Sequence, residues 1–572
     1  MFLKKSKKSY KKSSYETYAL TESYREGDKV KHRHIANLGS LTPEQAQRIR
    51  LVLKAQKLDE IFVGLLTDVV AKKHFRFLDV AVLDQIWRHF RLNDFFTERL
   101  LAEAMALNRC LEPKSKIRIK AWTENTVLPR LVQEECPGEY EVYRVLDEIA
   151  RKEEALQDHL HRQYLQLGLA ADNAVIYDIT SSYFEGNKCI LATYGYSRDH
   201  RPDRKQIVLA LVITQGGYPL YWQVMPGNVQ DVTTIRKLVV VLKERFGIEQ
   251  CLLIFDRGMV STENLQTILE EGFTYISALD RDEIKGLDIL EPHFPELLTE
   301  SWEDNLLAQG FSSYDQDLLY REHSGPGKRY IITYSRQLYG DQQESRKQRF
   351  EKAKQFIASL NEELSRAKRS RSEKATANKI DNRLHKLKMH KVFSYQLAPL
   401  TITTQGAKVC SFSVTYTVNE AELAGQQYLD GVSCFVTNVP DLTPVQIIGS
   451  YRRKNRIEEA FREIKSYLQL RPFHLTREER VRAHVTICVL GYLLLNALEE
   501  DLSSLEQPLS APAALEIFGQ CQLNRIGPKN SATYVESITE VSPEQTDLLQ
   551  GLDMQHLVKD KFLKNILEHS AM

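Results

Sequence analysis

The sequence predicts an α/β protein built on a mixed five-stranded sheet flanked by helices. Short runs of β-branched, aromatic and apolar residues begin near position 173 and alternate with helical patterns from about 231. The expected order is strand, strand, strand, helix, strand, helix, strand, which indicates a mixed sheet with helices to cover it. A large α+β insertion interrupts this unit, and a mainly helical region precedes it. The 572 residues are enough for two to four domains.

Five strands and two connecting helices form the expected core. Asp231 and Ser261 are suited to cap the two helices, which run to Phe246 and Glu270. Trp222, on the third strand, is interpreted as a core residue. The strands are expected at residues 173–180, 207–214, 220–225, 251–255 and 274–278.

The N-terminal third contains a different pattern. Residues 14–25 and 29–38 alternate as two strands around a Glu26-Gly27-Asp28 turn. Thr42 and Gln45 then form a capping box that opens a helix. We expect a basic β-hairpin and helix at 1–60, and a helical domain at 61–170. A cluster of Lys and Arg residues at 109–120 makes this second domain a candidate for DNA binding, although such clusters are more often solvated.

The insertion is expected at 281–440, between a first core segment at 171–280 and a second at 441–500. Within it, apolar residues from Phe350 to Ala367 recur at steps of three and four, which predicts a helix with a coiled-coil-like seam. A basic break follows, and Ile380, Leu384 and Leu387 resume the pattern, so that residues 345–391 are expected to form a basic helical hairpin. Residues 501–572 are expected to be a C-terminal helical tail.

Composition excludes several classes of protein. Lys+Arg 77 against Asp+Glu 76 is nearly balanced, so a nucleic-acid partner has to be met by local patches. Eight scattered cysteines without a CxxC pair argue against a zinc ribbon or a disulfide framework. The longest apolar run, 485–498, is too short to span a bilayer and predicts a buried helix. We therefore expect a cytoplasmic protein with reduced thiols.

A charged helix near residue 455 carries the first candidate site residues. At 3.6 residues per turn one face presents a single acid, Glu458, within a stripe of cations that has a tyrosine at one end. The alternative interpretation is an exposed helix with i,i+4 ion pairs, which is common. The residues on this face are Tyr451, Lys454, Glu458, Phe461, Arg462 and Lys465.

Two further acids lie at apolar strands. Asp178 is near the end of the first strand, and Asp256 directly follows the fourth. A carboxylate at such a position needs a partner, and strand ends are where ligands bind in open α/β sheets. The alternative is a turn-forming or capping Asp, more plausible for Asp256. Three oxygen ligands without a His/Cys cluster favour Mg²⁺ or Mn²⁺, and a pair of such ions can act on both oxygens of a phosphodiester.

These motifs resemble those of bacterial insertion-sequence transposases of the DDE class. The helix reads Tyr451-x2-Lys454-x3-Glu458-x6-Lys465 and is similar to the Tyr-Arg-Glu-Lys signature of that family. Asp178 lies in YDITSSYFEG and Asp256 in FDRGM, and the likeness covers roughly 170–495. Lys454 departs from the signature, because a lysine cannot form the bidentate phosphate fork of an arginine. Further similar segments are Gly195 to Asp203, Gly227-Asn228-x2-Asp231 and the run from Leu470 to His484.

The resemblance implies an RNase H-like core in which Asp178, Asp256 and Glu458 are catalytic and bind two Mg²⁺ or Mn²⁺ ions. It also implies a DNA transposase that binds the terminal inverted repeats of an insertion sequence, frees a 3′-hydroxyl and joins it to target DNA, usually as a homodimer. The protein is then expected to be bacterial and nucleoid-associated when bound to DNA. The expected DNA-binding residues are Tyr451, Lys454, Arg462, Lys465 and Arg257.

Other functions stay open at this point. A metal-dependent nuclease of the same fold would cleave without strand transfer, and a transposase-derived binding protein would be catalytically silent, which the presence of all three acids disfavours. A two-carboxylate glycosidase would leave the cationic stripe unexplained.

His484 is expected to pack in a helix interface rather than bind metal. Tyr183, Tyr194 and Tyr196 can stack on unpaired bases but are interpreted as core, and the basic hairpin at 345–391 is either a solvated coil or a DNA clamp.

Overall fold

The computed structural model describes residues 1–10, 13–55, 66–170, 174–186, 188–229, 234–259, 261–290, 294–404 and 407–568. The chain divides into two compact units. The terminal unit comprises Met1–His89, Glu98–Glu141 and Leu498–Met572, and the central unit comprises Phe90–Thr97 and Val142–Ala497. The expected cap Asp231 and the first residue of the first expected strand, Asn173, lie outside the described residues.

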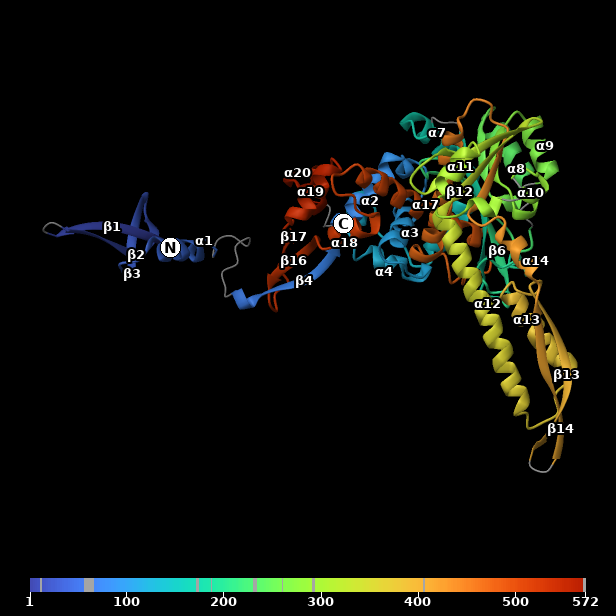
Figure 1. Cartoon of the computed structure of the whole chain (residues 1–572). Coiled ribbons are helices and arrows are strands. Elements are labelled where there is room, and N and C mark those ends of the chain that lie inside the picture. Colours follow the sequence, from blue (N-terminus) through green and yellow to red (C-terminus); the bar gives the residue numbers. More distant parts are fainter. Residues whose placement is uncertain are drawn as a thin grey trace. The chain divides into compact units, whose positions relative to one another are not determined.

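The central unit contains a large mixed sheet (Figure 1). Its five expected strands lie side by side in the order β7-β6-β5-β8-β9. The first three are antiparallel neighbours, whereas β5 pairs with β8, and β8 with β9, in parallel. Strands β5 and β6 are almost wholly buried, as their apolar sequences predict. The bounds are β5 Ala174–Tyr183, β6 Gln206–Thr214, β7 Pro219–Pro226, β8 Leu252–Phe255 and β9 Thr274–Ala278.

The expectation of five strands is wrong in one respect, because the sheet has nine strands within the part of the chain that the structure describes. The additional strands extend it beyond β9 in the order β15-β12-β11-β10. Strand β9 would otherwise present unpaired backbone groups at an edge, and β15 satisfies them by antiparallel pairing. All four strands come from the expected insertion: β10 Ser312–Ser313, β11 Leu318–Gly325, β12 Lys328–Ser335 and β15 Val432–Thr437.

Helices of the central unit pack against this sheet, among them α7 on β7, α9 on β9 and α16 on β5 and β6. Ser261 caps α9 by accepting a hydrogen bond from the Asn264 N–H at 3.1 Å, as predicted. Trp222 is buried and donates to Thr486 Oγ1 on α17 at 3.0 Å, which confirms it as a core residue. The helices are α6 Glu141–Arg151, α7 Glu153–Leu167, α8 Ile235–Val240, α9 Thr262–Glu270, α10 Arg281–Gly286, α11 Trp302–Ala308, α14 Glu420–Gln427, α15 Pro444–Arg452, α16 Asn455–Arg462 and α17 Glu478–Ser503.

Helix α17 contains the longest apolar run of the sequence. By length and composition it could cross a membrane, but 94% of its most apolar window is buried inside the protein. It therefore has the burial of a core helix, as its sequence predicts.

The insertion also forms an arm, seen as the yellow and orange elements of Figure 1. Helices α12 (Arg336–Ser365) and α13 (Glu373–Lys386) pack with the hairpin of β13 (Phe393–Thr404) and β14 (Ala407–Val418). The predicted seam residues Ala353, Ile357, Leu360, Leu364, Ile380, Leu384 and Leu387 are buried together with Phe412 and Val414 of β14. The expected helical hairpin is thus confirmed, and the two-stranded sheet supplies the partner surface that a lone hairpin would lack.

In the terminal unit, the described residues of the N-terminal segment form a three-stranded sheet, one strand more than expected. The additional strand β1 (Phe2–Tyr10) pairs with β2 (Ser13–Glu26), which pairs with β3 (Lys29–Gly39). The sequence of β1 did not predict a strand, because it is rich in lysine and lysine is depleted in strands. The predicted capping box opens α1 (Pro43–Ala55): the Gln45 N–H donates to Thr42 Oγ1 at 3.2 Å, and the Thr42 N–H donates to Gln45 Oε1 at 3.0 Å.

A second small sheet of the terminal unit joins segments that are far apart in sequence. Strand β4 (Val69–Arg76) pairs with β16 (Gln522–Pro528), which pairs with β17 (Val535–Ile538). Residues 61–170 and 501–572, expected to be helical, therefore contain strands as well. The helices are α2 Leu78–His89, α3 Arg99–Leu111, α4 Ile119–Thr123, α5 Leu128–Val132, α18 Ala511–Phe518, α19 Pro543–Gly551 and α20 Asp560–Glu568.

Candidate active site

The two strand carboxylates lie at the same end of the sheet. Strands β5 and β8 are parallel, and the last paired residues are Tyr177 and Phe255. Asp178 and Asp256 are the residues that follow this pair, so the register itself brings them to neighbouring positions. Each carboxylate accepts a backbone hydrogen bond from the next residue, Asp178 at 2.8 Å and Asp256 at 2.9 Å. Asp256 therefore has the local geometry of a turn residue as well as a place beside Asp178.

The third acid, Glu458, lies on a helix that packs against β5 and β6. The prediction of one continuous helix from 451 to 465 is wrong, because the chain forms α15, then α16, then a π-helical turn at Glu463–Tyr467. Between α15 and α16 the backbone tightens to three-residue hydrogen bonds, from the Lys454 N–H to Tyr451 O and from the Ile457 N–H to Lys454 O. The predicted single face is therefore divided: Phe461 is buried, whereas Glu458 is exposed.

The ammonium of Lys454 lies between the carboxylates. Its Nζ is 2.9 Å from Glu458 Oε1 and 3.7 Å from Asp256 Oδ1, and its side chain is only 8% exposed. Burial alone would lower the pKa of Lys454, but the hydrogen bond to Glu458 and the charges of Asp256 and Asp178 outweigh it and raise this pKa. Lys454 is therefore charged at neutral pH, and it is the cation that contacts Asp256 and Glu458 and acts electrostatically on Asp178.

Two neighbouring groups are shifted by burial. Desolvation raises the pKa of Asp178 to about 6, although the charge of Lys454 and the Ile179 N–H oppose it. Burial also raises the pKa of Tyr451 to about 12, so its hydroxyl stays protonated. The Tyr451 ring lies 4.6 Å from that of Phe435 on β15, which fixes the tyrosine beside the sheet. A carboxyl with a raised pKa next to a buried cation is typical of functional sites.

Lys465 belongs to a second polar cluster at the same strand. Its ammonium donates to Thr180 Oγ1 on β5 at 2.7 Å and to Asp199 Oδ1 at 3.0 Å. The other oxygen of Asp199 lies 3.1 Å from Arg471 Nη1 and accepts from the Tyr183 N–H at 3.2 Å. Sequence reasoning missed this role of Asp199, although a lone acid between Arg198 and Arg201, within a segment already singled out, was a signal.

The loop that carries Asp199 is held against the sheet by close backbone packing. A Cβ at Gly195 would lie 2.0 Å from Gly227 O. Both glycines lie in segments that the sequence singled out, and they permit a close backbone contact that residues with a Cβ could not make. Tyr194 and Tyr196 flank Gly195 and are 62% and 83% exposed. Their interpretation as core residues is therefore wrong.

The other expected site residues lie at the surface. Arg257, directly after Asp256, and Arg462, on α16, are both exposed. Arg462 Nη2 lies 3.9 Å from Glu459 Oε1, at the limit of an ion pair. His484 Nε2 donates to Leu470 O at 3.0 Å, and the ring packs edge-on against Phe473, which confirms it as a packing residue.

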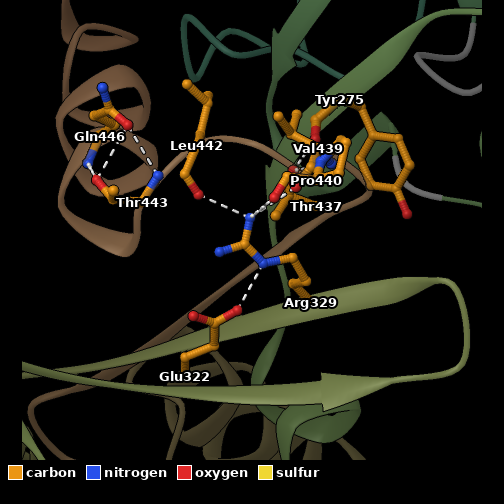
Figure 2. A network of polar contacts seen from close by, with 9 residues as sticks. All are labelled: Tyr275, Glu322, Arg329, Thr437, Val439, Pro440, Leu442, Thr443 and Gln446. Atoms are coloured by element: carbon orange, nitrogen blue, oxygen red, sulfur yellow. Dashed lines mark hydrogen bonds and ion pairs between the residues drawn. The ribbon is translucent and has the colours of Figure 1, made fainter.

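The chain leading into α15 is tied to the insertion by Arg329 of β12 (Figure 2). Its Nη1 donates to the carbonyls of Val439, Pro440 and Leu442 at 2.7, 3.3 and 2.8 Å, and its Nε donates to Glu322 at 2.6 Å. A capping box between Thr443 and Gln446 then starts α15. One guanidinium thereby sets the path by which the chain reaches the helix pair that carries Lys454 and Glu458.

The donor chemistry of the three acids suits a hard divalent cation, because carboxylate oxygens are the ligands that Mg²⁺ and Mn²⁺ prefer. The buried Lys454 ammonium shows that this position accommodates a cation. Among the described residues, no group of three or more His, Cys, Asp and Glu side chains is arranged to hold a metal ion. The acids thus fit a divalent ion in kind, and the ammonium lies among them in this conformation.

Comparison with known proteins defines the class first: the family model described as "Transposase DDE domain" matches residues 170–494, more than half of the chain. The chain belongs to this family and is a DNA transposase. The model described as "IS1634 family transposase, N-terminal domain" matches residues 3–61 and places it among insertion-sequence transposases. Membership implies dependence on divalent metal ions.

Other comparisons add little. No curated protein matches the chain significantly. Among solved structures, a cryo-EM structure of the piggyBac transposase synaptic complex with hairpin DNA is similar over 77% of both chains, at 9% identity and a TM-score of 0.33. A likeness at this level carries no argument about the fold or the site.

Proposed function

We propose that this DNA transposase binds the terminal inverted repeats of its insertion sequence, cleaves DNA strands there and joins the freed ends to target DNA. The observation that carries the proposal is one buried ammonium that contacts Asp256 and Glu458 and also feels the charge of Asp178. An ordinary ion-pair network at the surface is not expected to bury its cation, because burial costs free energy that exposed pairs avoid.

The sheet is proposed to contain an RNase H-like core. The order β7-β6-β5-β8-β9, with three antiparallel strands followed by two parallel ones, supports this assignment. Asp178 and Asp256 are then the carboxylates of the central strands, and Glu458 is the carboxylate of the covering helix. The domain boundaries expected from the sequence stay predictions.

In this proposal Asp178, Asp256 and Glu458 hold two Mg²⁺ or Mn²⁺ ions. When bound, such ions stabilise the negative charge on both the attacking and the leaving oxygen during cleavage of a phosphodiester. The protein orients the strand: Arg257, which follows Asp256, and Arg462, on the helix of Glu458, are exposed and can contact backbone phosphates. Lys465 and Tyr451 are held by neighbouring groups and act as fixed donors.

A homodimer that holds two DNA ends is also proposed. The arm of α12, α13, β13 and β14 is the candidate DNA clamp, because the loop between its helices carries Lys368, Arg369 and Arg371. Removal of the arm is expected to weaken binding of DNA without altering the carboxylates of the central sheet.

A strand-transfer assay tests the function. Purified protein is incubated with paired inverted-repeat ends of its own element, supercoiled target DNA and Mn²⁺ or Mg²⁺. Joined product that requires the divalent ion supports a transposase that cuts and joins. Free ends without joined product would instead identify a nuclease, and binding without cleavage would identify a catalytically silent protein.

A further inference from the structure

The environment of Lys454 is unusual for a lysine. Its side chain is 8% exposed, although the two acids it contacts, Asp256 and Glu458, are 45% and 60% exposed. The ammonium is thus buried more deeply than the two carboxylates that it contacts. An ammonium is costly to bury and stays in such a place only when opposite charge surrounds it.

The other cations of this segment have different partners. Arg453 donates to Gln215 Oε1, Arg456 donates to Gln215 O, and Lys465 donates to Asp199. Within the described residues 451–465, Lys454 is the cation that contacts Asp256 and Glu458. Because α15 ends at Arg452 and α16 begins at Asn455, Lys454 lies in the bend between them, where the buried side chain points toward the strand carboxylates.

We propose that Lys454 is a built-in competitor of the divalent ions: its ammonium neutralises the carboxylates, and it has to leave them before an ion can bind. This inference rests on the proposed function, which makes Asp178, Asp256 and Glu458 the ligands. Ammonium and divalent ion cannot share the same oxygens, since their like charges repel at contact distance. Ion binding therefore releases a charged lysine beside the place where the phosphate of the substrate is held.

The choice of lysine over arginine fits this role. A lysine is a compact charge on a flexible four-carbon stem, whereas an arginine grips a carboxylate through a rigid bidentate fork. The fork would hold Asp256 and Glu458 more firmly and would leave them less readily. In this proposal, the lysine that departs from the family signature sets the affinity of the three carboxylates for divalent ions.

Direct measurement of Mn²⁺ binding to the full chain, by electron paramagnetic resonance of free Mn²⁺ in the absence of DNA, tests the inference. For Lys454→Met we expect the dissociation constant to fall by about tenfold or more, because the competing cation is gone. For Lys454→Arg we expect it to rise several-fold. Arg453→Met is the matched control, since it removes the same charge from the adjacent residue, and we expect a change of less than about twofold.

A second measurement follows the lysine itself. Brief acetylation of the wild-type protein, quantified by mass spectrometry, is expected to label Lys454 several-fold faster once Mn²⁺ is added, while Lys465 serves as an internal reference held by Asp199. This readout does not depend on the folding of a variant. Unchanged labelling of Lys454 at saturating Mn²⁺ would overturn the inference.

The ligand assignment and the competitor role of Lys454 can be refuted separately. If wild-type protein binds Mn²⁺, and Asp178→Asn weakens that binding, the ligand assignment holds. Unaltered or weaker Mn²⁺ binding by Lys454→Met would then refute only the competitor role. If Asp178→Asn leaves Mn²⁺ binding unchanged, the proposed catalytic site itself is refuted.

Discussion

Lys465 Nζ lies 3.0 Å from Asp199 Oδ1, and the two side chains are only 12% and 10% exposed. This pair connects the π-helical turn after α16 to the loop between β5 and β6. Burial lowers the pKa of Lys465, although the charge of Asp199 opposes this effect. The lysine of the signature is therefore oriented by a carboxylate, which makes Asp199 a candidate positioning residue.

Asp199→Asn is expected to lower the cleavage rate by about 10- to 100-fold, because a misplaced positioning group can cost that much even when the chemistry is elsewhere. The affinity for DNA is expected to change little or to rise, since a negative charge is lost. Single-turnover cleavage and mobility shift, measured side by side, check this. Asp203→Asn is the control, because Asp203 forms exposed ion pairs with Arg201 and Arg204. Equal effects of the two substitutions would contradict the positioning role.

Lys465→Ala is expected to weaken DNA binding and to make its salt dependence shallower by about one unit of log–log slope, as the loss of one phosphate contact requires. The slope is measured by titrating KCl in a fluorescence anisotropy assay. An unaltered slope would show that Asp199 already neutralises this lysine and that no phosphate contacts it.

Asp178→Asn, Asp256→Asn and Glu458→Gln are each expected to abolish cleavage while DNA binding survives, because each removes a proposed metal ligand without changing side-chain size. Gel assays of cleavage and binding with the same DNA provide the measurement. Glu459→Gln is the control: it lies next to Glu458 on α16 and is exposed. Near-normal cutting by any of the three variants would remove that residue from the site.

Asp178→Asn is also expected to stabilise the protein at pH 7.5 in the presence of a chelator. The pKa of Asp178 is raised to about 6, so the folded state binds more protons than the unfolded state between about pH 4 and 6. Its contribution to stability is favourable below this window and is lost as the pH rises through 6. The gain is expected to be about 1–3 kcal/mol at pH 7.5 and to vanish near pH 4. Thermal unfolding at several pH values checks it, and a gain that did not depend on pH would refute it.

Arg329→Lys is expected to destabilise the central unit by about 1–3 kcal/mol and to lower cleavage, because one ammonium cannot replace the donors of the guanidinium to three carbonyls and Glu322. Thermal unfolding and the cleavage assay are the measurements. Arg366→Lys is the control, since Arg366 is 77% exposed at the end of α12. A loss of stability without a loss of cleavage would show that Arg329 does not position the helix of Glu458.

The core strands and the seam of the arm could be predicted because their signals are local. Burial of β5 and β6 follows from apolar runs, and the burial of Ile357 and Leu384 in one cluster follows from helical periodicity. Strand β1 and the pair β16–β17 were missed, because their stability comes from partners rather than from their own composition.

The candidate site likewise has features that are local in the sequence and features that depend on the fold. Sequence by itself determined the family, through Asp178, Asp256 and the spacing from Tyr451 to Lys465, and it determined which groups carry charge. The tertiary structure decided their surroundings: the parallel register that sets Asp178 beside Asp256, the bend that buries Lys454 next to Asp256 and Glu458, and the loop that brings Asp199 to Lys465. The physical reason is that charge and periodicity are properties of the residues in order, whereas burial and pairing depend on which distant segments share a neighbourhood, and these set the electrostatic energy of each group.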